Sequence, residues 1–177
     1  MRVVAGRLGG RKLMAPPKGV RPTTERVREA VFSILWSMGV LEECRVIDLF
    51  AGSGAMGIEA LSRGAVEATF VDIDAKVCDC VRSNLALLGL DSPGIRVVSA
   101  DACMWEIAAG SPVDIIFCDP PYSFNAWGLL LRRLDSRLLV AESTGKVEPP
   151  ANWDVVKIRD FGTSVVTVMS RRVPEST

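Results

Sequence analysis

Short, almost purely apolar runs alternate with helical patterns along most of this chain, and this alternation constrains the fold more strongly than any other feature. The apolar runs predict strands at residues 46–50, 68–71, 95–99, 113–118 and 138–141, and the segments between them predict helices at 56–63, 75–88, 102–109 and 125–134. The first four runs lack the alternation of a half-exposed strand, which indicates strands buried on both faces of a parallel sheet. We therefore predict an α/β fold with a Rossmann-like, mostly parallel sheet and right-handed crossover helices.

The two ends of the chain depart from this alternation. Residues 153–159 and 165–171 predict an antiparallel hairpin that closes one edge of the sheet and brings it to seven strands. Near the N-terminus, residues 2–5 and 11–14 flank the turn signal Gly9-Gly10 and predict a small β-hairpin.

The formal charges balance at 21 basic and 21 acidic residues, but they are unevenly distributed. Residues 1–28 contain eight basic residues and one acidic residue, a net charge of +7, and the remaining 149 residues carry −7. A basic segment on an acidic body indicates a polyanionic partner bound at one end, with a solvated tail as the alternative. We predict a basic extension over residues 1–22 and one α/β domain over residues 23–177, whose first helix (27–38) has Thr23 or Thr24 as its N-cap.

Several classes of protein are excluded by what the sequence lacks. The chain has no histidine, which removes a Ser-His or Cys-His nucleophile and the commonest metal ligand. The five cysteines lack zinc-site spacing, so we expect free thiols in a reducing compartment and no metal. No apolar run approaches the roughly 20 residues that span a membrane, and the N-terminus has no signal-peptide core. We expect a soluble, cytoplasmic protein, and nothing in the sequence indicates a dimer.

A glycine loop follows the first predicted strand. Gly52, Gly54 and Gly57 have the Gly-x-Gly-x-x-Gly spacing at which the backbone approaches a nucleotide cofactor at the start of a helix. Asp72 lies 20 residues after Gly52, at the end of the second strand, where a carboxylate accepts hydrogen bonds from both ribose hydroxyls.

Other acidic residues narrow the choice of cofactor. Asp48, inside the first strand, can order the glycine loop and meet a cationic amino group, whereas a pyrophosphate would be repelled. This favours S-adenosylmethionine over NAD. Asp101 could accept a hydrogen bond from an adenine amino group, or could cap the next helix. The expected cofactor-binding residues are Asp48, Phe50, Gly52, Ser53, Gly54, Asp72, Ile73, Asp101 and Ala102.

The tetrad Asp119-Pro120-Pro121-Tyr122 follows the fourth predicted strand, at the edge where open α/β sheets bind ligands. Neither proline has a backbone N–H, so the two carbonyls and the Asp119 carboxylate present acceptors only. Such acceptors can hold the N–H groups of an exocyclic amine, turn its lone pair toward a methyl donor and offset the developing positive charge. Tyr122 would stack on the base. We predict that these four residues are catalytic, with a rigid structural turn as the alternative.

The chain resembles the RsmD family of small-subunit (16S) ribosomal RNA guanine-N2 methyltransferases, class I enzymes that use S-adenosylmethionine. The resemblance lies in residues 9–13, 21–32, 48–65 and 119–122, and segment 21–32 is among the most restrictive of these. It implies a class I methyltransferase fold, methyl transfer to N2 of a guanine, and a substrate within an assembling 30S particle. It also implies that RNA docks on basic residues, which we take as Arg7, Arg11, Lys12, Arg21, Arg26 and Arg28.

This chain departs from the family where the edge of the base pocket forms. The connection from Tyr122 to the strand at residue 138 is short, the segment after Glu142 is abbreviated, and Asp72 replaces a glutamate. Three other functions remain open. The tetrad would also suit an adenine-N6 methyltransferase, the glycine spacing would suit a nicotinamide-dependent oxidoreductase, and a non-catalytic RNA-binding factor would keep the same fold.

Overall fold

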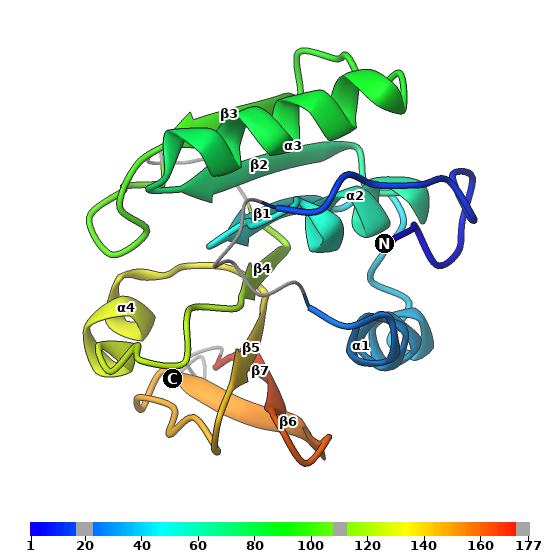
Figure 1. Ribbon diagram of the computed structural model, residues 1–177. Coiled ribbons are helices and arrows are strands. Elements are labelled where there is room, and N and C mark those ends of the chain that lie inside the picture. Colours follow the sequence, from blue (N-terminus) through cyan, green and yellow to red (C-terminus); the bar gives the residue numbers. More distant parts are fainter. Residues whose placement is uncertain (17–22, 108–112, 173–177) are drawn as a thin grey trace.

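A seven-stranded sheet forms the centre of the computed structural model, which describes residues 1–16, 23–107 and 113–172 (Figure 1). The strands are β1 (Arg45–Leu49), β2 (Glu67–Asp72), β3 (Ile95–Ser99), β4 (Ile115–Cys118), β5 (Leu138–Ser143), β6 (Trp153–Asp160) and β7 (Val165–Arg171). They lie in the order β3-β2-β1-β4-β5-β7-β6; β1 to β5 are parallel to one another, and β7 is antiparallel to both β5 and β6. The predicted fold, a mostly parallel sheet with an antiparallel C-terminal hairpin, is confirmed.

Helices cover both faces of this sheet. They are α1 (Glu25–Ser37), α2 (Ala55–Ser62), α3 (Ala75–Leu87) and α4 (Trp127–Arg133). Val46 and Phe117 belong to a hydrophobic cluster shared with α1, α2 and α3, whereas Ile47 and Ile116 belong to a second cluster shared with α4. In Figure 1, α1 and α4 lie on opposite sides of β4 and β5. Because both faces are covered, the central strands have almost unbroken apolar sequences.

The predicted helix at residues 102–109 is wrong over its described part. Residues 102–104 form a single turn, and no helix follows as far as Ile107; residues 108 and 109 lie outside the described part of the chain. The Asp101 carboxylate accepts the N–H of Cys103 at 2.8 Å, a local hydrogen bond that competes with helix formation. Trp105 and Ile107 then pack against the second hydrophobic cluster.

The N-terminal segment forms the predicted hairpin and packs onto the domain. Arg2 and Lys12 form an antiparallel bridge, and the N–H of Val3 donates to the carbonyl of Arg11 at 2.9 Å. Val3, Leu8 and Leu13 are buried in the cluster of α1 and α2. The described part of the extension, residues 1–16, therefore shares the core of the domain. The predicted boundary at residue 22 falls among residues 17–22, outside the described residues.

Four of the five cysteines are buried. All five cysteines are free thiols, and burial raises the pKa of Cys44 to about 11. Within the described ranges, no helix combines the length and apolar character of a membrane span, and no cluster of three or more acidic, cysteine or histidine side chains could hold a metal ion.

Candidate active site

A cleft of about 620 Å³ opens at the carboxyl ends of the parallel strands, where β1 lies between β2 and β4. This is the point at which the strand order reverses, and its volume suits a small-molecule ligand. The predicted residues that line it are Asp48, Phe50, Gly52, Ser53, Asp72, Ile73, Asp119, Pro120, Pro121 and Tyr122. The structure thus brings the glycine loop and the tetrad, which are far apart in sequence, to one cleft.

The other predicted cofactor residues lie outside the cleft lining. Gly54 has φ +76°, and a Cβ there would lie 3.1 Å from a methyl group of Val81, so the loop requires glycine at this position; its contact with the cofactor stays a prediction. A Cβ at Gly57 would lie 2.4 Å from the ring of Phe70, which explains the third glycine: it lets α2 pack closely on β2. Asp101 accepts the Cys103 N–H as described above, and its contact with adenine, like that of neighbouring Ala102, stays a prediction.

Asp72 holds the glycine loop against the end of β2. One carboxylate oxygen accepts the N–H of Gly52 at 3.2 Å, and the other accepts the N–H of Asp74 at 3.0 Å. Both hydrogen bonds fix the carboxylate at the cleft wall, where the predicted ribose contact would be made.

Asp48 is a buried carboxyl group at the base of the same loop. It accepts the N–H of Gly57 at 2.9 Å, which ties β1 to the first turn of α2. Burial raises the pKa of Asp48 to about 8; the Gly57 hydrogen bond opposes this rise, and the nearby Asp119 and Asp72 charges add to it. A cation bound in the cleft would favour the ionised form of Asp48.

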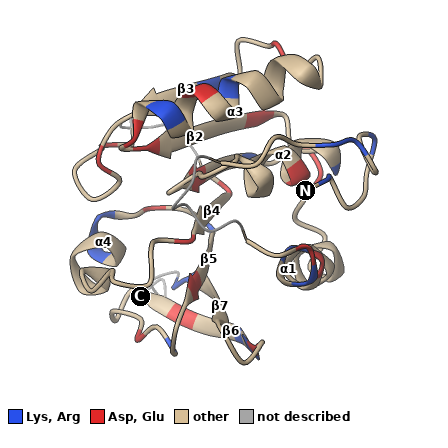
Figure 2. Cartoon of the chain, in the orientation of Figure 1, with Lys and Arg blue, Asp and Glu red and all other residues tan. Residues whose placement is uncertain are grey.

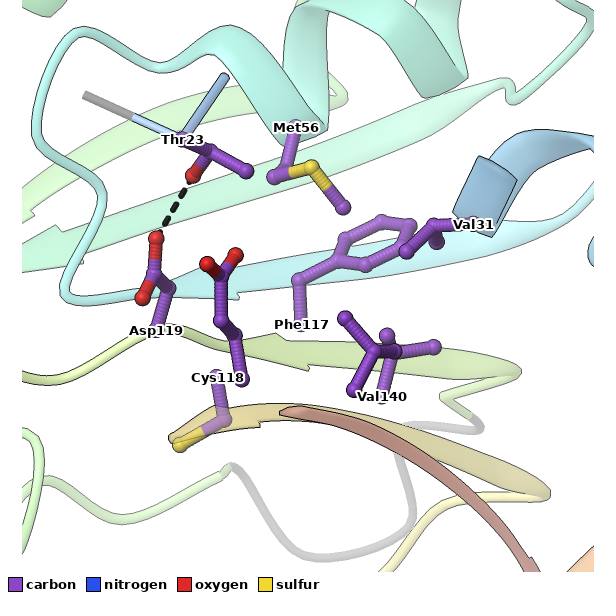
Figure 3. A pocket seen from close by; sticks show the side chains of 9 residues that line it. Thr23, Val31, Met56, Phe117, Cys118, Asp119 and Val140 are labelled. Carbon is purple, nitrogen blue, oxygen red and sulfur yellow. Dashed lines mark hydrogen bonds between the residues drawn. The ribbon is translucent and has the colours of Figure 1, made fainter. Parts of the chain in front are cut away.

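Thr23 contacts the first residue of the tetrad, a contact that the sequence did not reveal. Its hydroxyl donates to the Asp119 carboxylate at 2.6 Å, and Figure 3 shows the two side chains pointing toward each other. The neighbouring Thr24 is the N-cap of α1 and accepts the N–H of Val27 at 3.3 Å. The adjacent threonines therefore have separate functions: Thr24 begins the helix and Thr23 orients the carboxylate.

The remainder of the tetrad is held by its own neighbours. The carbonyl of Pro121 accepts the N–H of Phe124 at 2.8 Å, which leaves the Pro120 carbonyl as the better backbone acceptor for a ligand. Tyr122 is 45% exposed, and its hydroxyl donates to the carbonyl of Thr163, in the turn between β6 and β7, at 3.1 Å. The C-terminal hairpin thus anchors the tyrosine at the rim of the cleft.

Residues beyond the predicted motifs complete the cleft. Phe124 packs edge-on against Phe50, with ring centroids 5.4 Å apart, and also contacts Trp127. Glu142, from β5, is only 8% exposed and lines the cleft with Asp119. No local motif marks Phe124 or Glu142, because both reach the cleft only through strand order and packing.

The prediction that Arg28 contacts RNA is wrong. Its side chain is completely buried, and its guanidinium lies 3.7 Å from a carboxylate oxygen of buried Glu59. Glu59 also accepts the backbone N–H groups of Val4 and Ala5, at 2.7 and 3.0 Å. Arg28 therefore presents no charge to RNA in this structure; it helps to join α1, α2 and the N-terminal hairpin.

The other predicted RNA-binding residues are exposed where the structure describes them. Arg7, Arg11, Lys12 and Arg26 are exposed, and Figure 2 shows the basic residues of the N-terminal segment beside α2. Arg7 donates to the carbonyl of Leu61 at 3.3 Å, while Arg26 lies over the ring of Phe161. Arg21 is outside the described residues.

Comparisons with known proteins agree with this arrangement. A family model described as "Conserved hypothetical protein 95" matches residues 1–170. The Ribosomal RNA small subunit methyltransferase D of Escherichia coli (strain K12) is 37% identical over 166 residues, which cover 88% of this chain and 82% of the relative. The protein of the same name from Haemophilus influenzae is 34% identical over 174 residues, covering 92% and 89%. The solved structure titled putative methyltransferase yhhF from Escherichia coli has a TM-score of 0.83 and 34% identity, with 97% of each chain covered.

Proposed function

Since this chain belongs to the RsmD family, whose family model matches residues 1–170, we propose that it transfers a methyl group from S-adenosylmethionine to the exocyclic N2 of a guanine in small-subunit (16S) ribosomal RNA. One observation carries the proposal: the Asp119 tetrad lines the same cleft as Gly52 and Asp72 of the predicted cofactor site. The two relatives are named as methyltransferases of small-subunit ribosomal RNA, which supports this substrate class.

The cleft residues fit S-adenosylmethionine. Gly52 allows close approach at its φ of +56°, Asp72 offers carboxylate acceptors, and buried Asp48 gains by ionising beside a cation. When bound, the cofactor supplies a methyl group on a positively charged sulfur. Among the described residues, no lysine or arginine lines the cleft to offset the negative charge of a pyrophosphate such as that of NAD.

The tetrad supplies the groups that an aromatic amine needs in order to react. Such an amine is a weak nucleophile because its lone pair delocalises into the ring. The Asp119 carboxylate and the Pro120 carbonyl would accept its two N–H groups and direct the lone pair toward the methyl group. The carboxylate also offsets the positive charge that develops on nitrogen. No histidine base is required, since the proton can leave after the methyl group has been transferred.

The RNA would approach from the N-terminal hairpin. Arg7, Arg11 and Lys12 offer exposed charge there for phosphates. A base that enters the cleft must be unpaired or flipped out of its stack, so the target guanine is expected in a loop. We propose that the substrate is the RNA within an assembling 30S particle, that the protein acts as a monomer, and that it does so in the cytoplasm.

Locating the transferred methyl group tests this function. Purified protein, labelled S-adenosylmethionine and unmodified small-subunit RNA or particles are incubated, and the RNA is digested and analysed by mass spectrometry. We expect N2-methylguanine at one nucleotide with the natural chain and almost none with Asp119→Ala, which should still bind S-adenosylhomocysteine. A label on adenine N6, or binding of NADH with no binding of S-adenosylhomocysteine, would overturn the proposal.

A further inference from the structure

We infer that Glu142 distinguishes guanine from adenine in the base pocket by accepting a hydrogen bond from guanine N1–H, next to the N2 amino group held by Asp119. The inference rests on the proposed function and assigns a residue to its substrate specificity. Nothing in the glycine loop or the tetrad itself would provide this distinction, because both purines can present an amino group to Asp119.

The pairing of two parallel strands places Asp119 and Glu142 side by side. β4 and β5 pair with Phe117 opposite Val140 and Cys118 opposite Ala141. Asp119 and Glu142 are the next residues along the two strands, so they are neighbours at the carboxyl edge of the sheet. Both line the main cleft, together with Thr23.

The position of Glu142 is fixed and largely shielded from water. β5 lies between β4 and β7, and Glu142 is paired with Val166 of β7. The residue is only 8% exposed, so its charge lies largely out of contact with bulk water. The backbone of Glu142 is therefore fixed at the cleft wall, which limits where its carboxylate can lie, as the selection of a base requires.

Two adjacent acceptors match the hydrogen-bonding edge of guanine. That edge presents N1–H and the N2 amino group side by side, and both are donors. Adenine presents its N6 amino group beside N1, which is an acceptor and would face the Glu142 oxygens without a hydrogen. A site built to hydrogen-bond a donor rejects the analogue that lacks it, because the acceptor and the base would then meet without a hydrogen bond.

The variant Glu142→Gln tests the assignment, because its amide can donate to N1 of adenine. The target nucleotide is first mapped with the natural chain, and particles are prepared with guanine or adenine at that position. We expect Glu142→Gln to keep transfer to guanine particles at a lower kcat/KM, because its neutral amide oxygen accepts from N1–H more weakly than a carboxylate, and to gain measurable transfer to adenine particles. Binding of S-adenosylhomocysteine should stay within about twofold, and the exposed Glu148→Gln should behave as the natural chain.

A second experiment uses the unaltered protein, so it does not depend on how a variant folds. Particles carrying 2-aminopurine at the mapped position keep the C2 amino group but have an acceptor at N1. We expect the natural chain to methylate them at least about tenfold more slowly than guanine particles, and Glu142→Gln to narrow that ratio.

Distinct results separate the inference from the function on which it rests. Transfer to guanine N2 by the natural chain, together with Glu142→Gln within twofold of it on both kinds of particle, would overturn the role of Glu142 alone. Equal rates on guanine and 2-aminopurine would overturn it as well. Failure of the natural chain to methylate any guanine would instead overturn the proposed function.

Discussion

Two carboxyl groups at the carboxyl edge of the sheet have different environments. Asp48 is enclosed and accepts a hydrogen bond from the backbone of Gly57, whereas Asp119 faces the cleft and receives the Thr23 hydroxyl. Burial thus favours the neutral form of Asp48, while the threonine favours a fixed orientation of Asp119. The first difference can be tested through stability and the second through catalysis.

Asp48 should make stability fall as pH rises. Its pKa is about 8 in the folded chain, against an ordinary value of 3.8. At a pH between these two values the folded state therefore keeps a proton on Asp48 that the unfolded state has lost. The proton contributes its full stabilisation below about pH 4. Between about pH 4 and pH 8 the free energy of unfolding falls by up to about 1.4 kcal/mol per pH unit, and above about pH 8 the contribution is lost. Urea unfolding from pH 5 to 9 should show a flatter profile for Asp48→Asn than for the natural chain.

The exposed Asp79 provides the control for this measurement. Its side chain is 75% exposed, so Asp79→Asn should keep the pH profile of the natural chain. An identical slope in Asp48→Asn and the natural chain would show that Asp48 is ionised in the folded state.

Thr23 should affect catalysis without affecting cofactor binding. Thr23→Val keeps the shape of the side chain but removes the hydroxyl that donates to Asp119 at 2.6 Å. We expect kcat to fall about tenfold, which corresponds to about 1.4 kcal/mol in the activation free energy, and Thr23→Ser to restore most of it. Calorimetric titration should show unchanged affinity for S-adenosylhomocysteine; equal kcat in the valine and serine variants would contradict the positioning role.

At the scale of elements, α1, α2 and the N-terminal hairpin meet at one buried ion pair. Glu59 of α2 forms ion pairs with Arg28 of α1 and with Arg63. It also accepts hydrogen bonds from two backbone N–H groups of the hairpin. Burial lowers the pKa of Arg28, and the charge of Glu59 opposes that change. A buried pair of this kind is costly to break, because removing one partner leaves the other charge enclosed.

Arg28→Ala should therefore destabilise the fold rather than weaken RNA binding directly. We expect the free energy of unfolding to drop by about 3 kcal/mol, as for other broken buried pairs. Arg26→Ala, on the exposed side of the same helix, should cost less than about 1 kcal/mol. Urea denaturation of the two variants and the natural chain measures both effects, and similar losses of stability in the two variants would contradict the buried network.

The elements could be predicted from sequence wherever burial leaves a local signature. The strand predicted at 46–50 agrees with β1 to within a residue because an apolar run marks a strand covered on both faces. The strand predicted at 95–99 coincides with β3, but the expected burial on both faces is wrong there, since β3 lies at the edge of the sheet and its residues are half-buried or exposed. The helix predicted at 102–109 is wrong because hydrogen bonding by Asp101, together with packing of Trp105, overrides the local pattern. Thr23 and Glu142 escape prediction since both approach Asp119 through strand order and chain folding, over distances that no short motif spans.

At the scale of the whole molecule, the basic surface and the proposed active-site cleft lie in different places. Basic side chains gather on the N-terminal segment (Figure 2). The lining of the cleft at the strand ends includes Asp72, Asp119 and Glu142. Such an acidic cleft would repel a phosphate backbone but accept a neutral base that offers donors. This charge distribution favours binding of the RNA backbone at the N-terminal segment and binding of a single base in the cleft.

The N-terminal hairpin should account for part of the salt dependence of RNA binding. Arg11→Ala combined with Lys12→Ala removes two exposed charges. We expect weaker binding of small-subunit RNA and a slope of log K against log salt that is shallower by about 0.7–0.9 for each phosphate that the double variant no longer neutralises. Filter binding over a series of salt concentrations measures this, with Arg82→Ala on α3 as the control; an unchanged slope in the double variant would place RNA elsewhere.

Glu59 holds the hairpin through backbone groups of the N-terminal segment. Its oxygens bond to the peptide N–H groups of Val4 and Ala5, and every amino acid except proline has such a group. This attachment uses no side-chain atom of residue 4 or 5, so a substitution other than proline there leaves both hydrogen bonds available. Glu59 of α2 therefore supplies the polar part of the docking site for the N-terminus, beside the apolar contacts of Val3, Leu8 and Leu13.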